Sequence, residues 1–227
     1  MKRLALLLLA LHVGAPTVTA AQTVAGPVAP LTIARLRYEG GGDWYANPSS
    51  LPNLLAAIRR DTGLPTSERE LVVGLGDEAL WDVPYLYATG HGNIRFSDAE
   101  VETLRRWLRQ GGFFHIDDNY GMDESVRREL SRLFPEQELV EVPLDHPIYS
   151  VVHRFPKGIP KVHEHDGEPA QGFGLFQDGR LVVFYSYETD LGDGWEDPEV
   201  HNDTPEKRRA ALEMGVNLFA YAVGFAR

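Results

Sequence analysis

From residue 31 onward, the hydrophobic and polar positions of the chain alternate between two patterns. Short runs rich in β-branched and aromatic residues are typical of strands, and apolar positions that recur every three or four residues are typical of helices. The first pattern predicts strands over residues 32–38, 70–75, 83–89, 113–117, 173–176 and 180–187. The second predicts helices over residues 51–61, 97–110, 123–133 and 204–223.

Capping and turn residues mark several of these boundaries. Ser97 and Glu100 form a capping box, in which each side chain accepts a hydrogen bond from the other residue's backbone amide. Pro205 suits the first position of the last helix. The pair Asp178-Gly179, between the last two strands, is typical of a hairpin turn.

Strands that alternate with helices predict an α/β fold with a mostly parallel sheet covered on both faces and a late hairpin. We expect one domain over residues 31–227. The strands that end at Thr89 and Asp117 should be central neighbours, and the helices that begin at Ser97 and Thr204 should cover the sheet. In such sheets ligands bind beyond the carboxyl ends of the strands, so polar residues at those ends are candidates for a site.

The N-terminus has the pattern of a cleavable secretory signal. Lys2-Arg3 precedes the apolar run 4–13, and small residues at 18–20 suit cleavage before Ala21. The apolar run is shorter than the roughly 20 residues that span a bilayer; an uncleaved membrane anchor is the alternative. We therefore predict a signal peptide over residues 1–20, a flexible lead-in over 21–30, and a periplasmic or secreted protein without a membrane span after cleavage.

Composition excludes several classes of function. The chain contains no cysteine, which rules out thiolate catalysis and disulfides. Its formal net charge of −11 becomes −13 once Lys2 and Arg3 are removed with the signal, and so acidic a surface repels nucleic acid. The hydrophobic content of 43% is enough for a sizeable core.

Two glycine-containing strand ends could approach a ligand closely. The segment Gly40–Tyr45 follows the first strand, with a flexible surface turn as the alternative. Gly90-His91-Gly92 follows the third strand, and its backbone amides could donate to an anion. A histidine whose hydrogen bonds are satisfied within the loop is the alternative there.

The end of the fourth strand carries the most polar residues of the predicted core. His115 and Asp117 share one face of this strand, and Asp118, Asn119 and Tyr120 follow. Burying a histidine and an aspartate costs several kcal/mol unless each is paired. Paired acids at a strand end suit general-base work or cation binding. Capping of the next helix is the structural alternative.

Two later segments contain residues that bind metals in other proteins. Residues 188–197, which include Asp190 and Trp195, form an acidic stretch that could bind a divalent cation or be a solvated loop. His163 and His165 share a face on an extended strand, but a transition metal needs a third partner that their spacing does not supply. We therefore predict no cofactor and assign no metal site.

Several motifs resemble one bacterial family of unknown function. They are VPYLYATGHGN, SDAEVETLRRWLRQGGFFHIDDNYGMD, DHPIYS, YETDLGDGWED and RAALEMGVNLFAYAVG. Together they cover most of residues 31–227 and resemble the family called domain of unknown function 4159. More distantly, the layout is similar to ThuA-like proteins and to class I glutamine amidotransferases.

That distant resemblance implies a flavodoxin-like three-layer sandwich. In amidotransferases of this kind a cysteine follows the strand that Asp117 follows here, and a histidine and a glutamate follow a late strand. Asp117 stands about where the cysteine would be, and the late strand reads Tyr187-Glu188-Thr189-Asp190 without a histidine. Thiol-based glutamine hydrolysis is therefore excluded.

Two functions are compatible with these residues. One is a ligand-binding or assembly module that keeps the pocket of the fold, with a small polar molecule or a protein as its partner. The other is a periplasmic hydrolase on a small polar or sugar-like substrate, with Asp117 as general base or nucleophile beside His91 and Asp118. The expected ligand-binding residues are Gly90, Gly92, His115, Asn119, Tyr120, Asp190 and Trp195.

Overall fold

The computed structural model describes residues 29–225, so the predicted signal peptide lies outside the described residues. Within them the chain forms a seven-stranded sheet in the order β2-β1-β3-β4-β7-β6-β5. The strands are β1 (Ile33–Leu36), β2 (Leu71–Val73), β3 (Tyr85–His91), β4 (Phe113–Tyr120), β5 (Val140–Glu141), β6 (Gln171–Gln177) and β7 (Arg180–Tyr187).

The sheet is mostly parallel, as predicted. Strands β2, β1, β3, β4 and β7 run in one direction. At one edge of the sheet β6 runs antiparallel to β7, and β5 runs antiparallel to β6. Thr89 of β3 pairs with Asp117 of β4, so the two strands expected at the centre are neighbours. The hairpin β6–β7 turns at Asp178 and Gly179, whose φ values of 51° and 78° are the left-handed conformations that such a two-residue turn requires.

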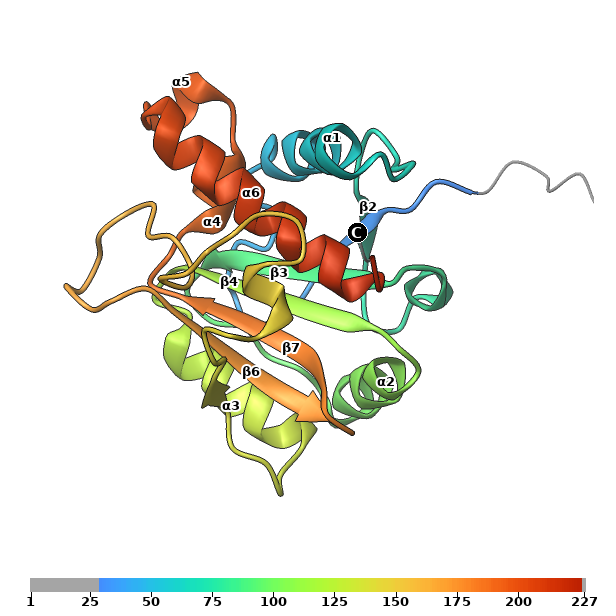
Figure 1. Ribbon diagram of the computed structural model, residues 1–227. Coiled ribbons are helices and arrows are strands. Elements are labelled where there is room, and N and C mark those ends of the chain that lie inside the picture. Colours follow the sequence, from blue (N-terminus) through green and yellow to red (C-terminus); the bar gives the residue numbers. More distant parts are fainter. Residues whose placement is uncertain (1–28, 226–227) are drawn as a thin grey trace, which may run out of the picture.

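Helices cover both faces of the sheet and produce three layers (Figure 1). Helices α1 (Ser50–Thr62) and α6 (Pro205–Ala222) lie on one face, and α2 (Asp98–Arg109) and α3 (Asp123–Leu133) lie on the other. The shorter helices are η1 (Glu78–Asp82), η2 (Pro147–Tyr149), α4 (Leu191–Trp195) and α5 (Pro198–His201).

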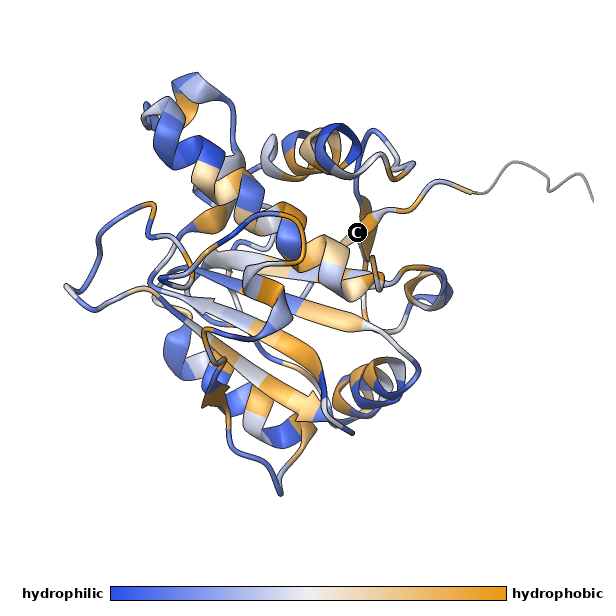
Figure 2. Ribbon diagram, viewed as in Figure 1, coloured by the Kyte–Doolittle hydropathy of each residue, from blue (hydrophilic) through white to orange (hydrophobic). Residues whose placement is uncertain are grey.

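Each face of the sheet has its own hydrophobic core. Leu104 of α2 and Leu130 of α3 pack on the face that contains Phe114, whereas Leu54 of α1 and Phe219 of α6 pack on the opposite face. The strands and the inner sides of the helices are accordingly the apolar parts of the chain (Figure 2). Among the described residues, no helix is both long and apolar enough to cross a membrane.

The predicted helix ends are present in the structure. Ser97 and Glu100 form both hydrogen bonds of the capping box at the start of α2. Gly63 ends α1 in the left-handed region at φ 74°, and the Thr204 side chain accepts a hydrogen bond from the Lys207 amide at the start of α6. These local signals fix the ends of helices whose inner faces are set by hydrophobic periodicity.

Two differences from the prediction bear on the polar residues at the carboxyl edge of the sheet. Strand β4 continues three residues beyond Asp117, because Asp118 and Tyr120 still pair with β3. The acidic segment 188–197 is not a solvated loop throughout, since it contains the buried helix α4. This helix is only five residues long, so it carries no periodic pattern, and its position depends on contacts with α1 and α6.

Candidate functional site at the carboxyl edge of the sheet

Asp117 is fully buried in the carboxyl-terminal half of β4 and holds the start of α4. Its carboxylate accepts hydrogen bonds from the hydroxyls of Tyr87, Ser186 and Thr189 and from the backbone amides of Leu191 and Gly192. The shortest of these are 2.5 Å from Ser186 and 2.7 Å from Gly192. Burial raises the pKa of Asp117 to about 7, although the Ser186 and Gly192 hydrogen bonds oppose this shift. The carboxylate therefore acts as a cap for the first turn of α4.

His115 lies on the same face of β4 as Asp117, as predicted, and is also fully buried. Its Nδ1 is 2.9 Å from the Tyr85 hydroxyl and its Nε2 is 2.9 Å from the Ser186 Oγ. Because the Ser186 hydroxyl makes its shorter contact by donating to Asp117, we assign the His115 proton to Nε2. Burial lowers the pKa of His115 to about 3, so the ring is neutral. Tyr85, His115, Ser186 and Asp117 thus form a buried chain of hydrogen bonds.

Asp118 faces the opposite side of the sheet and organises the turn into α3. Its Oδ1 accepts hydrogen bonds from the amides of Tyr120 and Met122 at 3.1 and 3.0 Å, and its Oδ2 accepts one from the Tyr185 hydroxyl at 3.1 Å. Burial raises its pKa. The neighbouring Asn119 is also buried. Asp118 therefore stabilises the start of α3 on one face of the sheet, whereas Asp117 stabilises the start of α4 on the other.

His91 is exposed at the end of β3 and pairs with the loop that follows β1. Its Nδ1 lies 3.0 Å from Asp43 Oδ2, and its backbone amide donates to Asp43 Oδ1. Gly90 has φ 145°, and a Cβ there would overlap the Tyr38 hydroxyl and the Asp43 side chain. The structure thus brings together the two glycine-containing segments, but the His91 amide is occupied by Asp43 rather than free for an anion.

The polar residues expected at this edge of the sheet fall into a buried group and an exposed group. His115, Asp117 and Asp190 have no exposed surface, whereas His91 and Tyr120 are exposed. Trp195 is also fully buried: its indole N–H donates to the Ala211 carbonyl at 2.8 Å, and its ring packs against Tyr87 and His115. No hydrogen bond joins His91 to Asp117 within the described part of the chain.

The same edge also holds a partly buried cluster of histidines and carboxylates around Asp190. We call it the histidine–carboxylate cluster; it consists of His163, His165, Asp190, Asp193, Glu196, His201 and Asp203. Asp190 Oδ2 lies 3.3 Å from His163 Nδ1 and 2.5 Å from His165 Nε2. The His163 and His165 pair and the acidic segment, considered separately in the sequence, therefore meet at one carboxylate.

His163 is the centre of this cluster. Hydrogen bonds to Asp190 and Asp193 raise its pKa to about 10, against the opposing effect of burial. Burial alone would raise the pKa of Asp193, but the hydrogen bond from His163 lowers it below its usual range. The ring of His165 packs at a tilt against Tyr120, with centroids 4.9 Å apart, which links the cluster to the end of β4.

Sequence reasoning did not identify several residues that build these two groups. They are Asn47, Tyr85, Tyr87 and Ser186. No local pattern reveals them: the Asn47 side chain donates to Asp193 across 146 positions, and the pair of Tyr85 with His115 spans 30. Asp193 and Glu196, by contrast, belong to the acidic segment that the sequence offered as a cation site, and His201 follows shortly after it.

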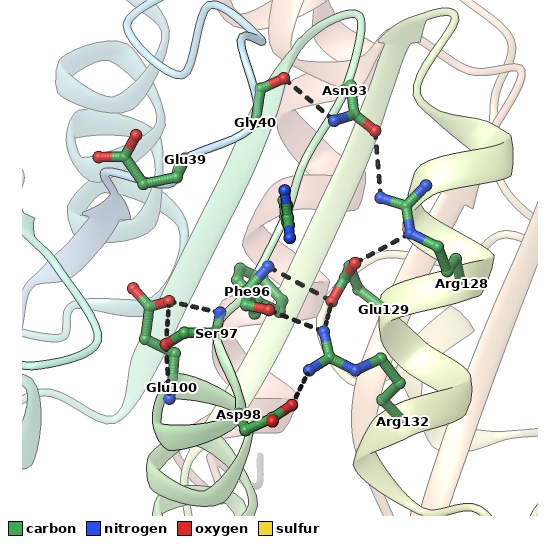
Figure 3. A pocket seen from close by; sticks show the side chains of 11 residues that line it. Glu39, Gly40, Asn93, Phe96, Ser97, Asp98, Glu100, Arg128, Glu129 and Arg132 are labelled. Atoms are coloured by element: carbon green, nitrogen blue, oxygen red, sulfur yellow. Dashed lines mark hydrogen bonds and ion pairs between the residues drawn. The ribbon is translucent and has the colours of Figure 1, made fainter.

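A large open groove lies elsewhere, between the end of β3 and helices α2 and α3 (Figure 3). It has a volume of about 1010 Å³ and is lined mainly by charged residues. Arg128 and Arg132 already pair with Glu129, and Arg132 also pairs with Asp98. The groove is therefore built largely from charges that neutralise one another, and the histidine–carboxylate cluster is the stronger candidate site.

These features define an α/β protein whose polar side chains gather at the carboxyl edge of a mostly parallel sheet. The chain belongs to the family described as Domain of unknown function (DUF4159), whose model matches residues 32–223. The family resemblance of the sequence motifs is thereby confirmed. No curated protein matches the chain.

Proposed function

We propose that this protein is an exported ligand-binding module with an amidotransferase-like, flavodoxin-like fold that lacks the catalytic cysteine. The order of its five parallel strands, β2-β1-β3-β4-β7, supports this fold, because the flavodoxin-like order is 2-1-3-4-5 when the strands are numbered consecutively. A distant relation to ThuA-like proteins is part of the same proposal. The signal-like pattern of residues 1–20 supports export.

The burial of Asp117 is the observation that carries the proposal. This residue stands about where the resemblance places the nucleophile, yet it has no exposed surface and accepts five hydrogen bonds. A catalytic group must come within hydrogen-bond reach of its substrate. Asp117 instead holds α4 in place, and α4 presents Asp190 and Asp193 to the histidine–carboxylate cluster. The arrangement supports binding at the cluster rather than chemistry at Asp117.

One observation favours the alternative of a hydrolase on a small polar or sugar-like substrate. The pKa of Asp117 is raised to about 7, which suits a general base at neutral pH. A substrate could reach this carboxylate only if α4 moved away from β4. The binding proposal requires no such movement and is therefore preferred, with a small polar molecule or a protein as the partner.

A thermal-shift screen tests the proposal. The purified protein is heated with neutral sugars, small carboxylic acids, amino acids and divalent cations, each at millimolar concentration. We expect at least one class to raise the midpoint of unfolding, because a ligand that binds only the folded state stabilises it. The shift should be smaller in Asp190→Asn, in which asparagine tolerates the left-handed backbone of position 190 (φ 51°).

The control variant is Asp178→Asn, the same change at an exposed left-handed position in the β6–β7 turn. It should retain the full shift. Absence of a shift with every class, or an equal shift in Asp190→Asn and the wild type, would contradict binding at the cluster. Hydrolysis of model esters or glycosides that Asp117→Asn abolishes would favour the hydrolase instead.

A further inference from the structure

Three side chains of the histidine–carboxylate cluster converge on one point. His163, Asp193 and His201 each place one ligand atom within 4.8 Å of the other two. Asp193 Oδ2 lies 3.0 Å from His163 Nδ1 and 3.6 Å from His201 Nδ1. Nitrogen and oxygen ligands about 2.1 Å from a tetrahedral zinc ion are about 3.4 Å from one another. The observed separations therefore suit ligands around one small cation.

Each of these three side chains is also held from its far side. His163 Nε2 lies 3.0 Å from Asp203 Oδ2, and His201 Nε2 lies 3.0 Å from Glu196 Oε2. Asn47 donates a hydrogen bond of 2.7 Å to Asp193 Oδ1.

Metal-binding histidines almost always donate their other N–H to a carboxylate, carbonyl or water, which fixes the ring and directs the lone pair of the near nitrogen. Both accepting carboxylates are nearly buried, with side-chain exposures of 6% for Asp203 and 4% for Glu196. The chain thus provides a second layer of partners as well as ligands.

An independent observation concerns Asp190, which is fully buried beside these ligands. Its Oδ2 lies 3.3 Å from His163 Nδ1, and its Oδ1 has no hydrogen-bond partner among the described residues. A buried carboxylate oxygen without a partner is costly, because nothing replaces the water that it loses. A cation held by His163 and Asp193 would place a positive charge next to this carboxylate and offset that cost.

We infer that His163, Asp193 and His201 bind a divalent transition metal ion of the zinc type, with Asp190 as the adjacent buried carboxylate. Two imidazoles and one carboxylate form a ligand set typical of zinc, whereas calcium and magnesium prefer oxygen ligands. Three protein ligands leave a fourth position open to water or to another ligand. Asp193 and His201 provide the further metal ligands that the pair His163 and His165 lacks in the sequence. This inference names the ligand of the binding module and rests on the function proposed above.

Calorimetric titration with Zn²⁺ tests the inference on protein without a histidine tag, after treatment with a chelator. We expect one zinc ion per chain and a rise in the unfolding midpoint, with no comparable binding of Mg²⁺ or Ca²⁺. His201→Gln should weaken binding by at least 10-fold. Asp203→Asn should weaken it by roughly 10- to 100-fold, since it removes a partner that orients His163.

The matched control is His91→Gln, because His91 is an exposed histidine at another strand end and pairs with Asp43. Its zinc affinity should equal that of the wild type. Circular dichroism verifies that each variant folds, and Asp203→Asn gives a second test if His201→Gln does not fold. Zinc affinity that neither variant changes, or the absence of zinc binding, would overturn the inference. If another compound of the screen still binds, the proposed function stands without the metal; if nothing binds, both fail.

Discussion

The backbone amide of Gly192 donates a 2.7 Å hydrogen bond to Asp117, 75 positions earlier in the chain. This bond joins the centre of the sheet to the first turn of α4. Replacing Asp117 with asparagine would turn an amide nitrogen toward groups that are themselves donors and leave them unpaired. We expect Asp117→Asn to lower the free energy of unfolding by about 2–4 kcal/mol, as measured by urea denaturation. A loss no larger than that of the exposed Asp178→Asn would show that the contacts of Asp117 contribute little.

The packing of α4 on the sheet can be tested at Gly192 itself. A Cβ at this position would lie 2.5 Å from the Tyr87 hydroxyl and 2.8 Å from Asn47 Nδ2. Gly192→Ala should therefore displace α4 and destabilise the protein by roughly 1–3 kcal/mol, the usual cost of overpacking. Gly76→Ala is the matched control, because a Cβ there would meet no atom within 4 Å. Equal unfolding midpoints for the two variants would contradict the tight contact.

Burial of neutral His115 makes stability depend on pH. Its pKa is about 3 in the folded protein against the usual 6.5 of a solvated histidine, so between these values the unfolded chain binds the additional proton. This contribution to stability is complete above pH 6.5 and is lost as the pH falls toward 3. The difference in unfolding free energy between wild type and His115→Gln should change by up to about 1.4 kcal/mol per pH unit in this window.

Asp117 has the opposite effect, since its pKa of about 7 favours folding as the pH falls from 7 toward 3.8. It is present in both proteins, so its contribution cancels in the difference unless His115 and Asp117 titrate together. Urea denaturation at pH 7, 6, 5 and 4 measures this difference. A value that is constant across the series would show that His115 is not neutral and buried.

The capping box of α2 provides a local prediction. The Ser97 side chain accepts a hydrogen bond from the Glu100 amide, at 3.3 Å. Ser97→Ala should lower the unfolding free energy by about 1 kcal/mol, because that amide loses its partner. Ser131→Ala, at an exposed position within α3, is the control and should have a smaller effect. Chemical denaturation of the two variants in parallel measures whether Ser97→Ala loses more unfolding free energy than Ser131→Ala.

Export is tested by N-terminal sequencing of protein recovered from its host. Cleavage after the small residues at 18–20 should give a chain that begins at Ala21 or Gln22 and is found in the periplasm or the medium. Protein that is exported but still begins at Met1 would indicate an uncleaved anchor. Protein confined to the cytoplasm would contradict export itself.

Local pattern was sufficient for the elements that have a repeating pattern or a cap. Helix α3 has the predicted bounds Asp123–Leu133, and the ends of α2 and α6 follow from Ser97 and Thr204. Strand β5 and helix α4 have two and five residues, too few for any period, so tertiary contacts decide their place. Short segments of this kind can be located only from the structure.

In the candidate site, too, local sequence reveals some residues, whereas only the structure reveals their partners. The cost of burying His115 and Asp117 correctly marked them as residues that need partners, but not which partners. Ser186, which links them, lies 71 and 69 positions away, in a strand with no unusual composition. His163 and His165 were recognised as a pair, whereas their meeting with Asp190 depends on how the chain returns before β6. Long-range placement therefore decided the chemistry of both groups.

The position of β7 between β4 and β6 has a consequence for incomplete chains. Strand β7 is the last strand in the sequence, yet it lies inside the sheet, and β4 pairs with it along residues 114–117. A chain truncated before Arg180, or one still emerging from a ribosome, leaves β4 with an unpaired edge next to Phe113 and Phe114. Unpaired apolar edges of this kind promote aggregation. Proteolytic fragments that end within residues 140–180 should therefore be insoluble, and the nascent chain needs protection until residue 187 has emerged.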